Sequence, residues 1–397
     1  MATVLPVELL DHIAQYASTD TQVRLAVVSR AAYNASVRAL YTSIAHMSIS
    51  RTTRCLLTLS ANLKVACLVR SFSLNIHSCQ ILQAFRALLA RALGNMTGLH
   101  VLSLQFERFA ISSVLSWVSC RLAKFVCAAE ASGDAYLISD FLSTQPAIEE
   151  LSIYCSQDSM ATLDPGTLPV LRSLSAPLHL LPKLLPSRLP RISRLSIIGG
   201  IADVQGFVLL GAVFGLDKHP ESMELAIDLD ITTDQMNPLD VCAGLSLLGL
   251  TAPFICVLML DIIKGQIRRD ELQTIFKYAL PNFPKLKTLI VVSTPPNSSA
   301  YGQLLSFSSL PEIPVPTPNN LGDISETSLA PLSQSPPLPP ESDSTRNPPS
   351  PVPDALYDGA CHIEILQAWH QIQSSLECVV FPVGIYTYAD RKCRRYN

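Results

Sequence analysis

The chain has 397 residues, of which 48% are hydrophobic and 15% charged, and its formal net charge is -3. This length suits two or three domains or one elongated array, with ample apolar material for a continuous core. A nearly neutral chain lacks the basic field that nucleic-acid binding needs, so we expect no nucleic-acid partner. The eleven cysteines include no Cys-x-x-Cys pair, which favours reduced thiols in an intracellular protein, cytoplasmic or nuclear.

Residues 1–48 carry the spacing of three short amphipathic helices. Pro6 suits the first turn of a helix because its missing N–H would find no partner there anyway. An apolar stripe follows at three- and four-residue steps, namely Leu9, Leu10, Ile13 and Tyr16 or Ala17. Thr19 or Asp20 can cap a second helix, and Ser29 can cap a third. So small a unit has little core of its own, and we expect it to lean on a partner or on the next domain.

A second pattern runs through the same helices. It consists of Leu5, Pro6, Leu9, Leu10, Ile13, Leu25, Val28 and Tyr33. This pattern resembles the F-box, the helical unit by which F-box proteins dock on the Skp-type adaptor of a cullin-based ubiquitin ligase. The resemblance implies that these residues serve the adaptor interface and the core of the unit, while the remaining chain binds a protein substrate. An alternative is that the helices only cap the following domain.

Residues 65–293 contain a loose repeat with a period of roughly 20 to 35 residues. Its unit is an apolar residue, two variable residues, an apolar residue, one variable residue and a further apolar residue. Copies begin at Val69, Leu99, Leu122, Ile148, Leu171, Ile192, Leu225, Ile255 and Leu286. The period-two ending of each copy predicts a short strand, and helical stripes occupy the intervals.

A strand and a helix at this period, each pair unable to bury its own apolar face, predict an α/β solenoid. The array resembles a leucine-rich repeat domain with irregular, helix-bearing repeats. A doubly wound parallel sheet is the alternative, because its strands alternate with helices too. In a solenoid the solvent-facing strand positions form the partner surface. The candidate positions are Arg70, Gln105, Glu107, Tyr154, Asp228, Asp230, Asp261 and Lys287.

Residues 294–354 interrupt the array with a stretch that holds 15 of the 29 prolines. Such a stretch forms no ladders and buries too little to offset its ordering entropy, so we predict a disordered insertion. Its Ser-Pro and Thr-Pro pairs are candidates for proline-directed phosphorylation. The repeat signature returns in residues 355–388 as a final repeat or cap. Residues 389–397 are predicted to be a solvated basic tail.

The sequence contains no nucleophile elbow, phosphate-binding glycine loop or zinc motif, so we expect no enzyme, cofactor or metal. Asp228, Asp230 and Asp234 form one acidic cluster, where a divalent cation is the alternative to simple solvation. Residues 241–260 are uncharged and long enough to span a bilayer, but Pro253 interrupts them, which favours a buried strand and no membrane partner. The sequence therefore predicts a substrate-recognition subunit of an SCF-type ubiquitin ligase. The alternative is a non-catalytic interaction scaffold without a ligase role.

Overall fold

A computed structural model describes residues 5–76, 83–106, 112–129, 137–215, 218–231, 236–293, 354–389 and 392–396. The strands of these residues form a single 13-stranded sheet whose spatial order follows the sequence from end to end. They are β1 (Ser43–Ile44), β2 (Ser71–Ile76), β3 (Val101–Phe106), β4 (Lys124–Ala129), β5 (Glu150–Tyr154), β6 (Ser173–Pro177), β7 (Arg194–Ile201), β8 (Met223–Asp230), β9 (Ile255–Lys264), β10 (Thr288–Ser293), β11 (Cys378–Phe381), β12 (Gly384–Ala389) and β13 (Lys392–Tyr396).

Helices alternate with most of the strands. They are α1 (Val7–Tyr16), α2 (Thr19–Leu25), α3 (Arg30–Thr42), α4 (Ile49–Ala61), α5 (Leu63–Ala66), α6 (Gln83–Asn95), α7 (Ser112–Leu115), α8 (Ile138–Ser143), α9 (Leu181–Leu184), α10 (Val204–Phe214), α11 (Pro238–Thr251), α12 (Arg269–Ala279) and α13 (Gly359–Ile372). Short 3-10 segments lie at Gln157–Met160, Leu178–Leu180, Leu189–Arg191 and Leu280–Asn282.

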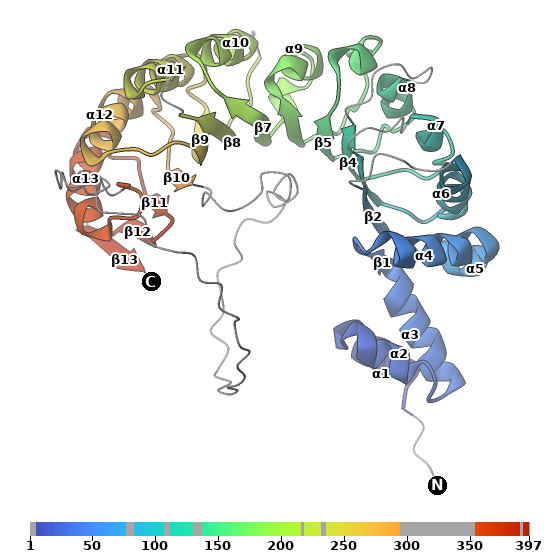
Figure 1. The fold of residues 1–397 in the computed structure, drawn as a ribbon. Coiled ribbons are helices and arrows are strands. Elements are labelled where there is room, and N and C mark those ends of the chain that lie inside the picture. Colours follow the sequence, from blue (N-terminus) through green and yellow to red (C-terminus); the bar gives the residue numbers. More distant parts are fainter. Residues whose placement is uncertain are drawn as a thin grey trace, which may run out of the picture. The chain divides into compact units, whose positions relative to one another are not determined.

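The strand order decides between the two architectures that the sequence allowed. A doubly wound sheet reverses its strand order at a switch point and carries helices on both faces. Here each strand from β1 to β10 pairs in parallel with the next one along the chain. Figure 1 shows the helices from α6 to α13 along one side of this sheet. The solenoid prediction is therefore confirmed, and the doubly wound alternative is wrong.

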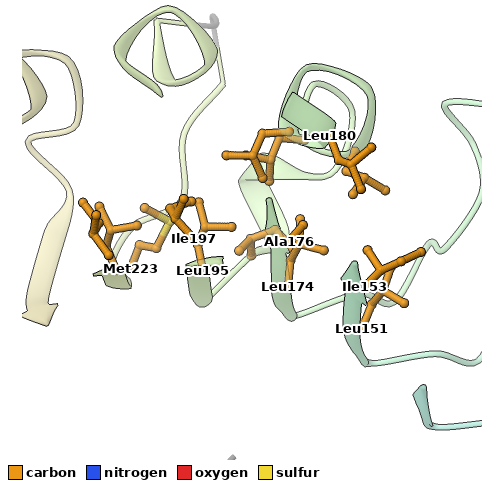
Figure 2. Packing of buried hydrophobic residues seen from close by; sticks show 14 of the residues in the cluster. Leu151, Ile153, Leu174, Ala176, Leu180, Leu195, Ile197 and Met223 are labelled. Carbon is orange, nitrogen blue, oxygen red and sulfur yellow. The ribbon is translucent and has the colours of Figure 1, made fainter. Parts of the chain in front are cut away.

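The middle apolar residue of every repeat lies in register with that of its neighbours. This row runs Phe72, Leu102, Phe125, Leu151, Leu174, Leu195, Leu225, Leu258, Leu289 and Val379. Each of these side chains is at most 2% exposed. Figure 2 shows Leu151, Leu174 and Leu195 on the side of the sheet where Leu180 of the helical layer lies. Burying one leucine contributes about 1.5–3 kcal/mol, and since neighbours share the row, each repeat depends on the next.

The copy predicted to begin at Leu225 is shifted by one position in the unit. Leu225 pairs with Leu195 on one side and Leu258 on the other, so it is the middle residue of its repeat. Met223 pairs with Ile255 and takes the first position, with one residue fewer before Leu225. The register shifts between Met223 and Glu224, which is the irregularity that accommodates the missing residue.

The array begins earlier than residue 65, where the sequence predicted it to start. Helix α3 runs directly into β1, and Ser43 and Ile44 pair with Ser71 and Phe72. Ile44 is buried, and helices α4 and α5 occupy the interval before β2. A strand of two residues has no periodicity that a sequence can show, which is why the boundary was misplaced.

The array continues across the insertion. Leu289 of β10 pairs in parallel with Val379 of β11, so the interruption lies inside the array, as predicted. The predicted disorder and the phosphorylation sites fall on residues 294–353, which lie outside the described part of the chain.

The prediction of a free tail from residue 389 onward is wrong for residues 392–396. Residues 392–396 form β13, which pairs antiparallel with β12, and β12 pairs antiparallel with β11. Strand β12 reads Gly-Ile-Tyr-Thr-Tyr-Ala, rich in the β-branched and aromatic residues that favour strands. The backbone N–H and C=O groups at the edge of β12 pair with residues 392–396, and backbone pairing does not depend on the charge of the side chains.

One hydrogen bond joins the two ends of the insertion, and another ties its C-terminal end to the segment before α12. The Ser293 hydroxyl contacts the Tyr357 hydroxyl at 3.0 Å, and the Ala355 N–H donates to the Ile267 carbonyl at 2.9 Å. We therefore expect a variant with residues 295–353 replaced by ten Gly/Ser residues to fold and to gain about 1–2 kcal/mol, since loop closure costs less for a shorter loop. Urea unfolding followed by circular dichroism measures the change. A loss of cooperative unfolding in this variant would contradict the expectation.

Candidate interaction surfaces

Helices α1 to α3 form a unit whose core is small. Its buried side chains are Ala14, Gln22, Ala32, Ala35 and Ser36. The Gln22 amide donates to the carbonyls of Ala14 and Ala17 at 2.8 and 3.1 Å. These bonds satisfy carbonyls at the end of α1 and fasten α2 to it.

Serine residues cap the second and third helices. Ser18 accepts a hydrogen bond from the Thr21 N–H at 3.3 Å, and Ser29 accepts one from the Ala32 N–H at 3.1 Å. The cap predicted at Ser29 is therefore confirmed. The cap predicted at Thr19 or Asp20 lies one residue earlier, because serine is itself a preferred N-cap and an acidic residue also suits the first helical turn.

The eight residues of the F-box-like pattern lie on this unit, and none is buried. Leu10 and Leu25 are half-buried, whereas Leu5, Pro6, Leu9, Ile13, Val28 and Tyr33 are exposed. Val28 reaches 71% exposure. The expectation that these residues form the core of the unit is wrong for the six exposed ones, because Ala14, Gln22, Ala32, Ala35 and Ser36 occupy the buried positions. Whether the eight residues bind an adaptor stays a prediction.

Further apolar side chains of the unit are exposed that the sequence pattern did not include. The full set, which we call the N-terminal apolar surface, is Leu5, Val7, Leu9, Ile13, Tyr16, Val23, Val27, Val28 and Tyr33. Val27 and Tyr16 are 86% and 81% exposed. The sequence did contain a signal for this surface. Three short helices carry more large apolar residues than so small a core can bury, so some of them had to be exposed. Exposed apolar side chains gathered on one small unit mark an interaction site.

The second surface is the face of the sheet that points away from the apolar rows, here called the helix-free face. Five of the predicted partner-facing residues alternate with buried apolar residues on their strands and so lie on it, namely Gln105, Tyr154, Asp228, Asp230 and Asp261. Gln105 and Asp261 are only 8% and 7% exposed, contrary to expectation. Strands lie about 4.8 Å apart, so neighbouring side chains shield one another even on an open face.

Two of the other three predicted residues, Arg70 and Lys287, precede strands of the sheet. Arg70 precedes β2 and donates to the Gly98 carbonyl at 2.9 Å. Lys287 precedes β10 and pairs with Glu377 at 3.0 Å. Glu107 lies outside the described residues.

Ion pairs cross the middle of the helix-free face. Glu150 of β5 lies 3.0 Å from Lys124 of β4 and 4.0 Å from Arg194 of β7. Exposed pairs of this kind contribute about 0–1 kcal/mol each, so they fix the charge pattern more than the stability.

Asp228 and Asp261 lie side by side on β8 and β9, in register. The Gly199 N–H donates to Asp228 at 3.4 Å, which is a long hydrogen bond. Burial, reinforced by the nearby charge of Asp261, raises the pKa of Asp228 to about 6. No cluster of three metal-binding side chains occurs within the described residues, and Asp234 of the candidate cation site lies outside them.

We expect Asp228→Asn to stabilise the protein at pH 7.5 by about 1–3 kcal/mol. The folded state raises the pKa of this carboxyl from 3.8 to about 6, so its ionisation opposes folding above pH 6. The gain should shrink as the pH falls from 6 towards 4, because the folded carboxyl is then protonated and the unfolded carboxyl approaches its own pKa of 3.8. Urea unfolding at pH 7.5 and pH 4 measures this, with the exposed Asp158→Asn as control. An equal gain at both pH values would contradict the charge argument.

Residues 241–260 do not form one continuous helix. Helix α11 ends at Thr251, and β9 begins at Ile255, on either side of Pro253. Across the residues that the structure describes, no helix has the length and apolar character to cross a bilayer.

Comparison with known proteins gives likeness to solved structures but no match to a family model or a curated sequence. Among solved structures, the chain is similar to the leucine-rich repeat-containing protein LegL7 from Legionella pneumophila, at 16% identity and a TM-score of 0.38, over 74% of this chain and 88% of that one.

Proposed function

We propose that the chain is a non-catalytic recognition subunit that docks through α1 to α3 on the Skp-type adaptor of a cullin-based ubiquitin ligase and holds a protein substrate on its repeats. The N-terminal apolar surface is the observation that supports this most. Val27 and Val28 are 86% and 71% exposed on a unit whose own core consists mostly of alanines. A partner that covered them would gain about 25 cal/mol for each Å² of apolar surface removed from water.

The proposed activity is to bring two proteins together. A substrate held on the array stands at high effective concentration beside the ubiquitin carrier that the cullin recruits, which accelerates transfer without any chemistry by this chain. The continuous sheet from β2 to β11 supplies a surface long enough for a protein partner.

The test is calorimetric titration of the full-length chain with a purified Skp-type adaptor. Ile13→Asp and Val28→Asp change side chains that are exposed in the free protein, so both variants should keep the wild-type circular dichroism spectrum. We expect each variant to weaken adaptor binding by about a hundredfold, because a charge buried in an apolar interface costs several kcal/mol.

Val208→Asp is the matched control, since Val208 is an exposed valine on α10, outside the N-terminal unit. It should bind the adaptor as the wild type does. If the folded wild-type chain does not bind the adaptor, the ligase role fails. The interaction scaffold without an adaptor then becomes the better proposal, because the open face of the array does not depend on α1 to α3.

A further inference from the structure

The helix-free face changes character along the array. One in-register row of this face runs Ser73, Ser103, Val126, Ser152, Ser175, Ser196, Ala226, Met259, Ile290 and Val380. From β2 to β7 the row consists mainly of serine. From β9 to β11 it consists of large apolar side chains. A solvent-facing sheet surface is ordinarily polar. The apolar residues of this row on β9 to β11 therefore indicate a surface that a partner covers.

The apolar residues of β9, β10 and β11 form a group that we call the β9–β11 patch. It comprises Val257, Met259, Ile290, Val292 and Val380. All five are half-buried, which leaves part of each side chain open to solvent. Partly exposed apolar side chains on three adjacent strands form a binding surface for another apolar group.

Two carboxylates border this patch. Asp261 follows Met259 by two residues on the same face of β9, and its register partners are Asp228 on β8 and Val292 on β10. The basic side chain at the end of β9, Lys264, pairs with Asp230 at 2.7 Å. Adjacent carboxylates repel each other, and a cation placed beside them relieves that repulsion.

We propose that the β9–β11 patch together with Asp228 and Asp261 binds a segment of a partner protein in which a Lys or Arg side chain neighbours a large apolar side chain. The apolar side chain lies on Met259 and Ile290, and the cation lies at the carboxylates. This inference rests on the substrate-holding role of the array and is independent of the adaptor.

Charge argues that the occupant is another protein and not the insertion of this chain. Residues 294–353 contain five acidic residues and one basic residue, a net charge of -4. The acidic pair repels such a segment and attracts a basic one, and charge complementarity of this kind sets partner choice and association rate.

The probe is a fluorescein-labelled octapeptide of alternating Leu and Arg, titrated with the full-length chain and followed by anisotropy. Two further peptides replace Arg by Glu or Leu by Gly. We expect the Leu/Arg peptide to bind at least tenfold more tightly than either of them. Equal binding of the Gly/Arg peptide would show non-specific attraction of positive charge and overturn the proposal.

Variants locate the site. The double change Asp228→Asn and Asp261→Asn keeps the shapes of both side chains, and Ile290→Ser removes apolar surface from the patch. Each should weaken binding of the Leu/Arg peptide at least tenfold, whereas Asp158→Asn, which changes an exposed acid elsewhere, should not. Wild-type affinity in the double variant, with an unchanged circular dichroism spectrum, would overturn the proposal.

The same titration is repeated on the chain with residues 295–353 replaced by the Gly/Ser linker. Equal affinity of the Leu/Arg peptide for both chains supports a separate protein as the occupant. Peptide binding that occurs only after the replacement would show that the insertion covers the surface, and would overturn the choice of a separate protein. Adaptor binding is measured on the same samples. Lost peptide binding with intact adaptor binding refutes only this inference, and the reverse result refutes only the ligase role.

Discussion

Replacement of Trp369 by alanine is expected to lower the free energy of unfolding by about 3–5 kcal/mol. Trp369 lies on α13, the first helix after the insertion, and is fully buried. Its ring lies 4.7 Å from that of Phe276 on α12 and 6.2 Å from that of Phe381 on β11, measured between ring centroids. The side chain therefore joins the repeat before the insertion to the one after it, and its removal opens a cavity between them.

The variant Trp369→Phe separates packing from hydrogen bonding. The indole N–H of Trp369 is buried without a hydrogen-bond partner. Phenylalanine keeps much of the ring and removes that unpaired donor, so we expect a cost well below that of alanine. Urea unfolding measures both variants, and Trp117→Ala is the control because Trp117 is 58% exposed. Equal costs for Trp369→Phe and Trp369→Ala would contradict this account.

Hydrogen bonds link α13 to the rest of the C-terminal segment, so a cavity beside Trp369 should destabilise that whole segment. The His362 ring lies 2.8 Å from the Ala355 carbonyl through Nε2 and 2.9 Å from the Tyr386 hydroxyl through Nδ1. A carbonyl only accepts, so Nε2 donates and Nδ1 accepts from the tyrosine. Tyr388 donates to the Leu366 carbonyl at 2.7 Å. Helix α13 thus holds the return from the insertion and the terminal hairpin together.

The repeat phase was readable from the sequence because burial inside the array is local. Leu102 and Leu104 alternate with Ser103 on one strand, and that alternation alone determines which face each residue occupies. The same logic located the return of the array after the insertion, at Leu376, Val379 and Phe381, all of which are buried.

The candidate site was less readable, because sequence does not show what covers an apolar residue. Leu9 and Ile13 have the spacing of a core stripe, yet both are exposed, and Ala14, Ala32 and Ala35 are buried instead. Asp261 reads as a solvent-facing strand residue, yet it is buried. Both errors arise from the packing of neighbouring elements, which a single strand or helix pattern does not contain.

Two glycines with left-handed backbone test the packing around Asp228 and Asp261. Gly265 follows β9 with a φ of +99°, and a Cβ atom there would lie 2.3 Å from the carbonyl oxygen of Ile231. Gly199 in β7 has a φ of +96°, but a Cβ atom there would meet nothing within 4 Å. Both positions strain an L-residue, and only Gly265 adds a collision with backbone.

We therefore expect Gly265→Ala to cost about 2–5 kcal/mol and Gly199→Ala about 1–2 kcal/mol. Left-handed backbone costs an alanine about 1–2 kcal/mol at either site, and forcing an extra atom into a packed region adds about 1–3 kcal/mol. The Ile231 N–H donates to the Lys264 carbonyl at 2.9 Å, so the collision at Gly265 cannot be relieved without loosening the contact between the ends of β8 and β9. Urea unfolding of both variants measures the difference. Equal costs would mean that this contact gives way freely, and that Asp228 and Asp261 are held less firmly than the register of β8 and β9 implies.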